Sequence, residues 1–118
     1  MHQNHDDSML QANGARQADQ RFARQLRALA HPSRLAIVRQ LAERDRCCCN
    51  DFCDCLDLAQ STISQHLEQL REAGLVSRQS DGTRSLFWLE RDSLDQLSEA
   101  IEAIAIARRP AETKGGQE

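Results

Sequence analysis

The sequence contains no long apolar stretch. Charged residues interrupt every candidate before it reaches the roughly 18 residues that a membrane-spanning helix needs, so we expect no membrane association. Residues 1–13 are polar and acidic rather than basic and then apolar, which is not the pattern of a secretory signal. We therefore expect a cytoplasmic location, where thiols are kept reduced.

Cysteine is missing from the whole chain apart from one short stretch. All five cysteines lie between Cys47 and Cys55, and the first three are consecutive. Consecutive cysteines cannot join distant parts of a fold, so a disulfide framework is excluded. A cluster this dense is instead expected to bind or sense something through its thiols.

The chain also lacks a surplus of positive charge. Its formal net charge is −3, which is not the composition of a wholly basic nucleic-acid binder. DNA binding stays open, because only the local potential at the contacting face matters. No strand–helix–strand pattern, phosphate-binding glycine loop or Ser-His-Asp set is present either. We therefore predict that the protein is not an enzyme.

The chain has 118 residues, of which 40% are hydrophobic, and can build one modest core. We predict a disordered N-terminal arm over residues 1–17, a folded domain over 18–109 and a disordered tail over 110–118. A domain of this size often gains stability by dimerising.

Apolar residues at helical spacing predict two helices separated by His31 and Pro32. The residue before a proline is pushed out of the helical region, whereas proline itself is tolerated in a first turn. One helix therefore ends here, and the next begins at Pro32 or Ser33. The first helix, from about Ala18, is signalled by Phe22, Leu26 and Leu29. The buried stripe of the second is expected to be Leu35, Val38 and Leu41, helped by Ile37 and Ala42.

Two further helices are predicted after a charged break at residues 43–46. A short one runs over 51–57, with Asn50 as its N-cap. The next covers 60–72 and ends at Gly74, because glycine readily takes the left-handed conformation that follows a helix. The buried stripe of this helix is predicted to be Ile63, Leu67 and Leu70.

A β-hairpin and a closing helix complete the predicted domain. Strand candidates at 75–80 and 84–89 flank Asp81-Gly82, which is a strong hairpin signal. The closing helix starts at Asp92 or Ser93 and ends at Pro110. Two adjacent helices joined by a tight turn, followed by a hairpin, predict a mainly α-helical fold of the winged helix-turn-helix type. The apolar face of the closing helix is Leu94, Leu97, Ile101 and Ile104.

The run from Ala28 to Leu35 and the run from Gln60 to Val76 are two separated motifs in a fixed order. They resemble the opening signature and the recognition helix of the ArsR/SmtB family of arsenical- and metal-responsive repressors, and the similarity covers about 18–107. The resemblance implies a homodimeric repressor that leaves double-stranded operator DNA, an imperfect palindrome, when a metal, metalloid or other inducer binds.

Members of this family differ in where the inducer binds. One type carries Cys-x-Cys-x-x-Cys at the start of the helix before the recognition helix, and Cys48 and Cys53 match its first and last thiols. Asn50 stands at the middle position, which is a departure. A second type uses Asp and His on the last helix, which has no His here. Another type pairs a thiol with one on the last helix, but no cysteine follows Cys55.

We predict that trivalent arsenic or antimony binds Cys48, Cys49 and Cys53, because three convergent thiolates satisfy the pyramidal geometry of these ions. Cys49 and Cys53 are one helical turn apart, roughly 6 Å at Cβ, and Cys48 can swing back toward them. The helix N-terminus is expected to lower the pKa of these thiols. Cys47 and Cys55 are further candidate ligands, Cys55 also in trans, unless they pack as small hydrophobic residues.

Other ligands stay open at this point. Four thiols would also hold zinc, cadmium or lead, and one reactive thiol with a resolving partner would make a redox sensor. A metal store without DNA is a further class, but it would need neither a recognition helix nor a wing.

The predicted recognition helix begins with a polar face, and in a helix-turn-helix the N-terminal residues of this helix contact base edges in the major groove. Two arginines bracket the hairpin turn and suit phosphate or minor-groove contact from a wing. The apolar faces of the first and last helices, including Phe22 and Leu26, predict the dimer face unless they serve the core alone. The candidate DNA contacts are Gln60, Ser61, Thr62, Ser64, Gln65 and His66, with Arg78 and Arg84 of the hairpin.

Overall fold

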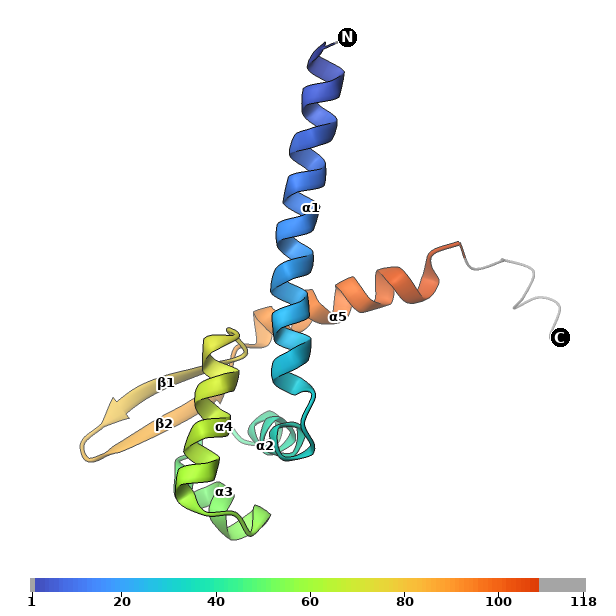
Figure 1. The fold of residues 1–118 in the computed structure, drawn as a ribbon. Helices are drawn as coiled ribbons and strands as arrows, with labels where there is room; N and C mark the ends of the chain where they lie inside the picture. The colour runs from blue at the N-terminus through green and yellow to red at the C-terminus, as the bar shows by residue number, and fades with distance from the viewer. Residues whose placement is uncertain (1, 109–118) are drawn as a thin grey trace, which may run out of the picture.

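The computed structural model describes residues 2–108, with side chains from residue 14 onward. Short connections join the helices, and one antiparallel hairpin precedes the last helix. The elements follow the predicted order (Figure 1). None of the described helices combines the length and the apolar character that a membrane crossing needs. The elements are α1 (His2–Leu29), α2 (Pro32–Glu43), α3 (Cys49–Leu56), α4 (Gln60–Glu72), β1 (Val76–Asp81), β2 (Arg84–Leu89) and α5 (Arg91–Ile106).

Helix α1 begins at His2, whereas the sequence predicted a disordered arm over 1–17 and a helix only from residue 18. That prediction followed from the lack of helically spaced apolar residues, a spacing that marks the buried face of a helix. Figure 1 shows the N-terminal part of α1 projecting away from the other elements. A helix without neighbours carries no such pattern. The segment contains no proline, and its one glycine, Gly14, is tolerated within a helix. The predicted tail over 110–118 lies outside the described residues.

The connection from α1 to α2 forms at His31 and Pro32, as predicted. His31 is extended, and its Nδ1 accepts a hydrogen bond of 3.1 Å from the N–H of Ser33. This bond satisfies one of the N–H groups that have no partner within the first turn of a helix. Pro32 follows at the first helical position, where its missing N–H costs nothing.

The core lies where α2, α3, α4 and the hairpin meet. The predicted stripe of α4 is confirmed, because Ile63, Leu67 and Leu70 are all fully buried. The predicted stripe of α2 is partly wrong: Ile37 and Leu41 are fully buried, one turn apart, but 41% of Leu35 is exposed, and Ala42 is exposed too. The largest fully buried side chains are Phe52, Ile37, Leu41, Ile63, Leu67, Leu70, Leu75, Val76 and Cys47.

Helix α3 starts earlier than predicted and is capped differently. Its N-cap is Cys48 rather than Asn50. The carboxylate of Asp51 reaches back and accepts a 2.9 Å hydrogen bond from the Cys48 N–H. The helix ends at Asp57, which is left-handed with φ of 55° and donates its N–H to the carbonyl of Cys53. A carboxylate at the third position of the helix also complements the positive end of the helix dipole. Asp51, rather than Asn50, is therefore the side chain that stabilises the start of α3.

The hairpin is confirmed, but its loop lies one residue later than predicted. Asp81 pairs with Arg84, so the loop is Gly82-Thr83 rather than Asp81-Gly82. Gly82 takes a φ of 69°, which a residue with a Cβ would adopt only with strain. The hairpin then leads into α5, which begins at Arg91 with Glu90 as its N-cap, slightly before the predicted start at Asp92 or Ser93.

Gly74 ends α4 in the predicted left-handed conformation, with φ of 82°, and the following N–H of Leu75 donates to the carbonyl of Leu70. No neighbouring atom blocks a Cβ at Gly74, so only the backbone conformation opposes a side chain there. We expect Gly74→Ala to lower the free energy of unfolding by about 1–2 kcal/mol, measured by urea denaturation.

Gly14→Ala is the matched control, because Gly14 lies inside α1 with open space around it and no positive φ. Alanine there should leave the free energy of unfolding unchanged or raise it by up to about 1 kcal/mol, with a gain in helical circular dichroism. Equal losses in the two variants would contradict the assignment of Gly74 to a left-handed cap.

Candidate DNA-binding and thiol site

A groove opens between the start of α3, the start of α4 and the hairpin. Its volume is about 470 Å³, and its lining joins Cys48 and Cys49 to Gln60 and Ser64 of α4. We call this cavity the thiol groove. Two predicted thiol ligands and four predicted DNA contacts therefore surround one cavity. The rest of its lining is Asn50, Arg78, Thr83, Arg84, Ser85 and Phe87.

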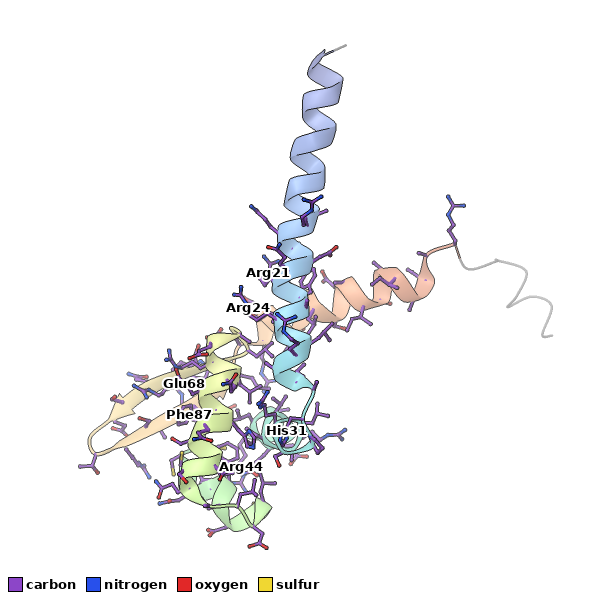
Figure 2. The ribbon with its side chains drawn as sticks, viewed as in Figure 1. Arg21, Arg24, His31, Arg44, Glu68 and Phe87 are labelled. Atoms are coloured by element: carbon purple, nitrogen blue, oxygen red, sulfur yellow. The ribbon has the colours of Figure 1, made fainter. Side chains whose placement is uncertain are left out.

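Cys47 fixes the cysteine segment to the hairpin through its backbone. Its N–H donates to the carbonyl of Phe87 at 3.0 Å, and its carbonyl accepts from the N–H of Phe87 at 2.8 Å. Phe87 lies on β2 and is labelled in Figure 2. The Cys47 side chain is fully buried, and burial raises the pKa of its thiol. In this arrangement Cys47 has the packing role that the sequence left open as an alternative.

The Cys49 thiol is influenced by Ser64 of α4 and by two other candidate thiols. Burial raises the pKa of the Cys49 thiol, the hydroxyl of Ser64 lowers it through a side-chain hydrogen bond, and the nearby sulfurs of Cys53 and Cys48 raise it further. The net pKa is above its ordinary value, so the predicted lowering by the helix N-terminus is wrong for Cys49. The cost of removing a thiolate from water outweighs the attraction of one short helix end.

The remaining thiols differ in exposure. Cys48 and Cys53 are half-buried, Cys55 is exposed, and all are free. Among the described side chains, no three Cys, His, Asp or Glu groups already stand in a geometry that would hold a metal ion. The thiols of Cys48, Cys49 and Cys53 suit a thiophilic ion by their chemistry. Binding would therefore require the first turn of α3 to rearrange and bring their sulfurs together.

The start of α4 presents a polar surface. Gln60, Ser61, Ser64 and Gln65 are exposed, whereas Thr62 is half-buried. Buried Ile63 and Leu67 lie on the opposite side of the helix and attach it to the core. On the hairpin, Arg78 and Arg84 are both exposed and line the thiol groove.

His66 is placed differently from the other predicted DNA contacts. It is half-buried, and its ring centroid lies 4.6 Å from that of His31, which Figure 2 labels beside α2. Its Nδ1 accepts a 3.3 Å hydrogen bond from Nε of Arg34. His66 therefore joins α4 to the start of α2, and its role as a DNA contact stays a prediction.

Sequence reasoning missed how the hairpin holds the cysteine segment. The guanidinium carbon of Arg46 lies 4.2 Å from the centre of the Trp88 ring, and the same side chain donates to Oε1 of Gln79 at 3.2 Å. Residues 43–46 were interpreted only as a charged break. The two-residue period of β2 was the available signal, since it places Ser85 and Phe87 on one face of the strand, and both line the thiol groove.

Comparison with known proteins identifies the family. Residues 31–78 match the sequence profile of the bacterial regulatory protein, arsR family. The arsenical resistance operon repressor of Bacillus subtilis is 30% identical over 77 residues, which cover 65% of this chain and 73% of that protein. The chain belongs to the ArsR family. The family resemblance of its two motifs is therefore confirmed, and this is a family of transcriptional regulators rather than enzymes.

Other ArsR-family proteins agree with this assignment. The HTH-type transcriptional repressor SmtB of Mycobacterium tuberculosis is 40% identical over 86 residues, which cover 73% of this chain but 62% of that repressor's length. The crystal structure of a possible transcriptional regulator for arsenical resistance superposes with a TM-score of 0.63 at 33% identity, covering 70% of this chain and 84% of that chain.

A solution structure of a homodimeric winged helix-turn-helix DNA-binding domain from Mycobacterium bovis, a possible ArsR-family regulator, superposes with a TM-score of 0.62 at 25% identity. The superposition covers 81% of this chain and 87% of that chain. The predicted winged helix-turn-helix fold is confirmed.

The His66 cluster makes stability depend on pH. Burial lowers the pKa of His66, and the charges of His31 and Arg34 lower it further. The folded chain therefore binds fewer protons at His66 than the unfolded chain, whose His pKa is about 6.5. The stabilisation is present above that value and is lost as the pH falls below it.

We expect the melting temperature to fall between pH 7.5 and 5.5 by more in the wild type than in His66→Gln, which keeps an acceptor but does not titrate. Differential scanning calorimetry at both pH values checks this. Parallel losses in the two proteins would show that His66 does not contribute.

Proposed function

We propose that this ArsR-family chain is a transcriptional repressor that binds double-stranded operator DNA and acts in the cytoplasm. The exposed polar start of α4 supports this proposal, because the N-terminal residues of the second helix in such folds enter the major groove. Gln side chains pair with adenine edges, and Ser hydroxyls contact bases or phosphates. Gln60, Ser61, Ser64 and Gln65 are the proposed contacts of α4, with Thr62 beside them.

The hairpin would contact the DNA backbone next to α4. Arg78 and Arg84 are exposed and carry the positive charge that phosphates attract. The whole chain has a net charge of −3, so its electrostatic attraction for DNA is local and modest. A second copy of α4 and the hairpin, supplied by a partner protomer, would therefore contribute much of the affinity for DNA. Dimerisation is for this reason part of the proposed function.

Apolar side chains left open on α1 and α5 support a homodimer formed through these helices. Exposed fractions are 45% for Leu26, 47% for Ile101 and 78% for Ile104. Side chains of this kind normally find an apolar partner, and the described chain leaves them uncovered. A two-fold axis between the protomers would present two α4 helices to two half-sites, so the operator would be an imperfect palindrome.

We further propose that trivalent arsenic or antimony is the inducer and that Cys48, Cys49 and Cys53 bind it. The observation that carries this proposal is the position of Cys48 and Cys49 in the thiol groove, beside Ser64 and both hairpin arginines. A ligand there would disturb the relation of α4 to the hairpin, on which DNA contact depends. Cys47 is buried and Cys55 is exposed, so both are secondary candidates.

The proposed binding step conserves atoms and electrons. Arsenous acid carries three hydroxyl groups, and each of three thiols forms one As–S bond as one As–O bond breaks. The thiol proton leaves with the hydroxide as water, so nothing is oxidised or reduced. The product is a neutral arsenic trithiolate, formed without a net release of protons.

Charge favours this ligand over a divalent ion. Cadmium, zinc or lead bound by the same three thiols would expel three protons and leave one negative charge in a half-buried site, close to the Asp51 carboxylate. Burying an uncompensated charge is costly. A divalent ion or an oxidant is nevertheless the alternative inducer, and each is an arm of the experiment below.

The test is an electrophoretic mobility shift on the DNA upstream of the protein's own gene, in a reduced sample. We expect arsenite or antimonite to release wild-type protein. In Cys48→Ser, Cys49→Ser and Cys53→Ser, the arsenite concentration for half-release should rise by more than about tenfold, because each change removes one bond to the ion. Cadmium, zinc, lead and peroxide complete the panel.

Cys55→Ser is the matched control, because this exposed thiol lies on the same helix as Cys53 but is not one of the three proposed ligands. It should respond to arsenite like the wild type. Specific DNA binding that cadmium or peroxide relieves, and arsenite does not, would replace the proposed inducer while keeping the repressor. Failure of the protein to bind any upstream DNA would overturn both.

The dimer face is tested by Ile101→Asp, which places a carboxylate among the exposed apolar residues of α5. We expect the dissociation constant of the dimer, measured by analytical ultracentrifugation, to rise by at least about tenfold. Gln96→Asp adds the same charge at an exposed polar position of α5 and should leave the dimer unchanged. Equal dimerisation of both variants would rule out this face.

A further inference from the structure

A second cavity opens where α1 meets the end of α4. Its volume is about 290 Å³, and it shares no lining residue with the thiol groove. Three arginines and one carboxylate line it, and we call it the arginine pocket. Its lining is Arg24, Arg27 and Ala28 of α1, Arg34 of α2, and Gln69, Glu72 and Ala73 at the end of α4.

The half-buried Arg34 is already held in place. Its Nη1 donates a 3.2 Å hydrogen bond to the carbonyl of Ala28, and its Nε donates to Nδ1 of His66 at 3.3 Å. A guanidinium has five N–H groups in a fixed planar fork, so two bonds leave three donors available. A side chain fixed in this way loses little conformational freedom when it binds a further partner.

The two arginines of α1 have no partner of their own. Arg24, which Figure 2 labels on α1, and Arg27 are three residues apart, so their side chains lie on the same side of the helix. Both are exposed, and neither forms an ion pair or a hydrogen bond with a described residue. Glu72 lines the same cavity, but the one ion pair of the described side chains joins Arg71 to Glu68.

The lining of the arginine pocket therefore has a surplus of positive charge. Three guanidinium groups face one carboxylate around a single cavity, in a chain whose net charge is −3. An oxyanion would neutralise this surplus. Arginine suits such a ligand, because two N–H groups of its planar fork match two oxygens of a phosphate or carboxylate.

We propose that the arginine pocket binds a small phosphate-class anion, either inorganic phosphate or a phosphate monoester. A phosphate monoester carries about −1.5 to −2 charges at pH 7, which matches the charge surplus of the lining. Arg34 would donate from its fixed fork, Arg24 and Arg27 would donate from α1, and the amide of Gln69 would donate from α4. The thiols take no part, so the inference goes beyond the proposed function and does not depend on it.

An anion in this position would connect three helices. Its donors come from α1, α2 and α4, and the unfolded chain does not bring them together. A ligand that binds the folded chain alone stabilises it by mass action, so the melting temperature should rise with the phosphate concentration.

The experiment titrates the full-length protein with inorganic phosphate while chloride keeps the ionic strength constant. We expect saturable shifts of the arginine Nε–H signals in nuclear magnetic resonance spectra. Arg24→Gln and Arg27→Gln should each raise the dissociation constant by about fivefold to tenfold, because each change removes a charged donor. Glu72→Gln should lower it by about threefold, because the change removes the negative charge of the lining.

Arg39→Gln is the matched control. Arg39 is an exposed arginine of α2 that does not line the pocket, so its loss changes the net charge equally and should leave the dissociation constant unchanged. Equal weakening by Arg24→Gln and Arg39→Gln would assign the effect to general attraction of counterions and overturn the site. The absence of saturable binding would overturn it too.

Two further ligands define the class of anion. Glycerol phosphate, a phosphate monoester, is titrated in the same way, and the tighter of the two phosphates identifies the source of the anion. Succinate carries two carboxylates, and tighter binding of succinate than of either phosphate would overturn the phosphate assignment. Neither arsenite nor operator DNA is present in these titrations, so their outcome is separate from that of the proposed repressor function.

Discussion

The pair of backbone hydrogen bonds between Cys47 and Phe87 is the constraint on which the site depends. These bonds attach the cysteine segment to β2, so that α3 starts against the hairpin and not elsewhere on the surface. Arg46 strengthens the attachment from outside by lying on the Trp88 ring. Without this link the thiols, the start of α4 and the hairpin arginines would not border one groove.

The same attachment explains how so small a domain brings the thiol groove next to the proposed DNA-contacting surface. The thiol groove has its walls on α3, α4 and the hairpin, and the last two are the elements that would contact DNA. A ligand bound at the first turn of α3 would therefore act directly on the DNA-contacting surface. Coupling energies of about 1–3 kcal/mol are typical of allosteric proteins, and they do not require a long pathway.

Burial decides the direction in which the pKa of the Cys49 thiol is shifted. Cys49 lies at a helix N-terminus, which favours the thiolate, yet its pKa is raised because the half-buried site disfavours charge. A protonated thiol suits arsenous acid, because its proton leaves as water together with a hydroxyl group of the acid, whereas a divalent cation would release that proton to the solvent. The departure at Asn50 from the Cys-x-Cys-x-x-Cys pattern has a structural counterpart, since α3 begins at Cys49 and is capped by Asp51.

The sequence by itself determined the order of the elements, the buried stripe of α4, the left-handed end at Gly74 and the family. These features follow from local rules: helical spacing of apolar residues, the conformational freedom of glycine, and the restriction that Pro32 places on His31. The helical spacing of apolar residues, however, reveals only those helices that have a buried face. The projecting part of α1 shows no such spacing, and it was therefore predicted as disordered.

Only the tertiary structure decided which polar and thiol side chains meet. His66 stands in the predicted recognition helix but turns toward His31 and Arg34, and Cys47 stands in the cysteine cluster but is buried. Both outcomes depend on residues more than 30 positions away in the chain, Arg34 for His66 and Phe87 for Cys47. Local patterns carry no information about such partners, because the docking of the hairpin and of α2 against α4 creates them.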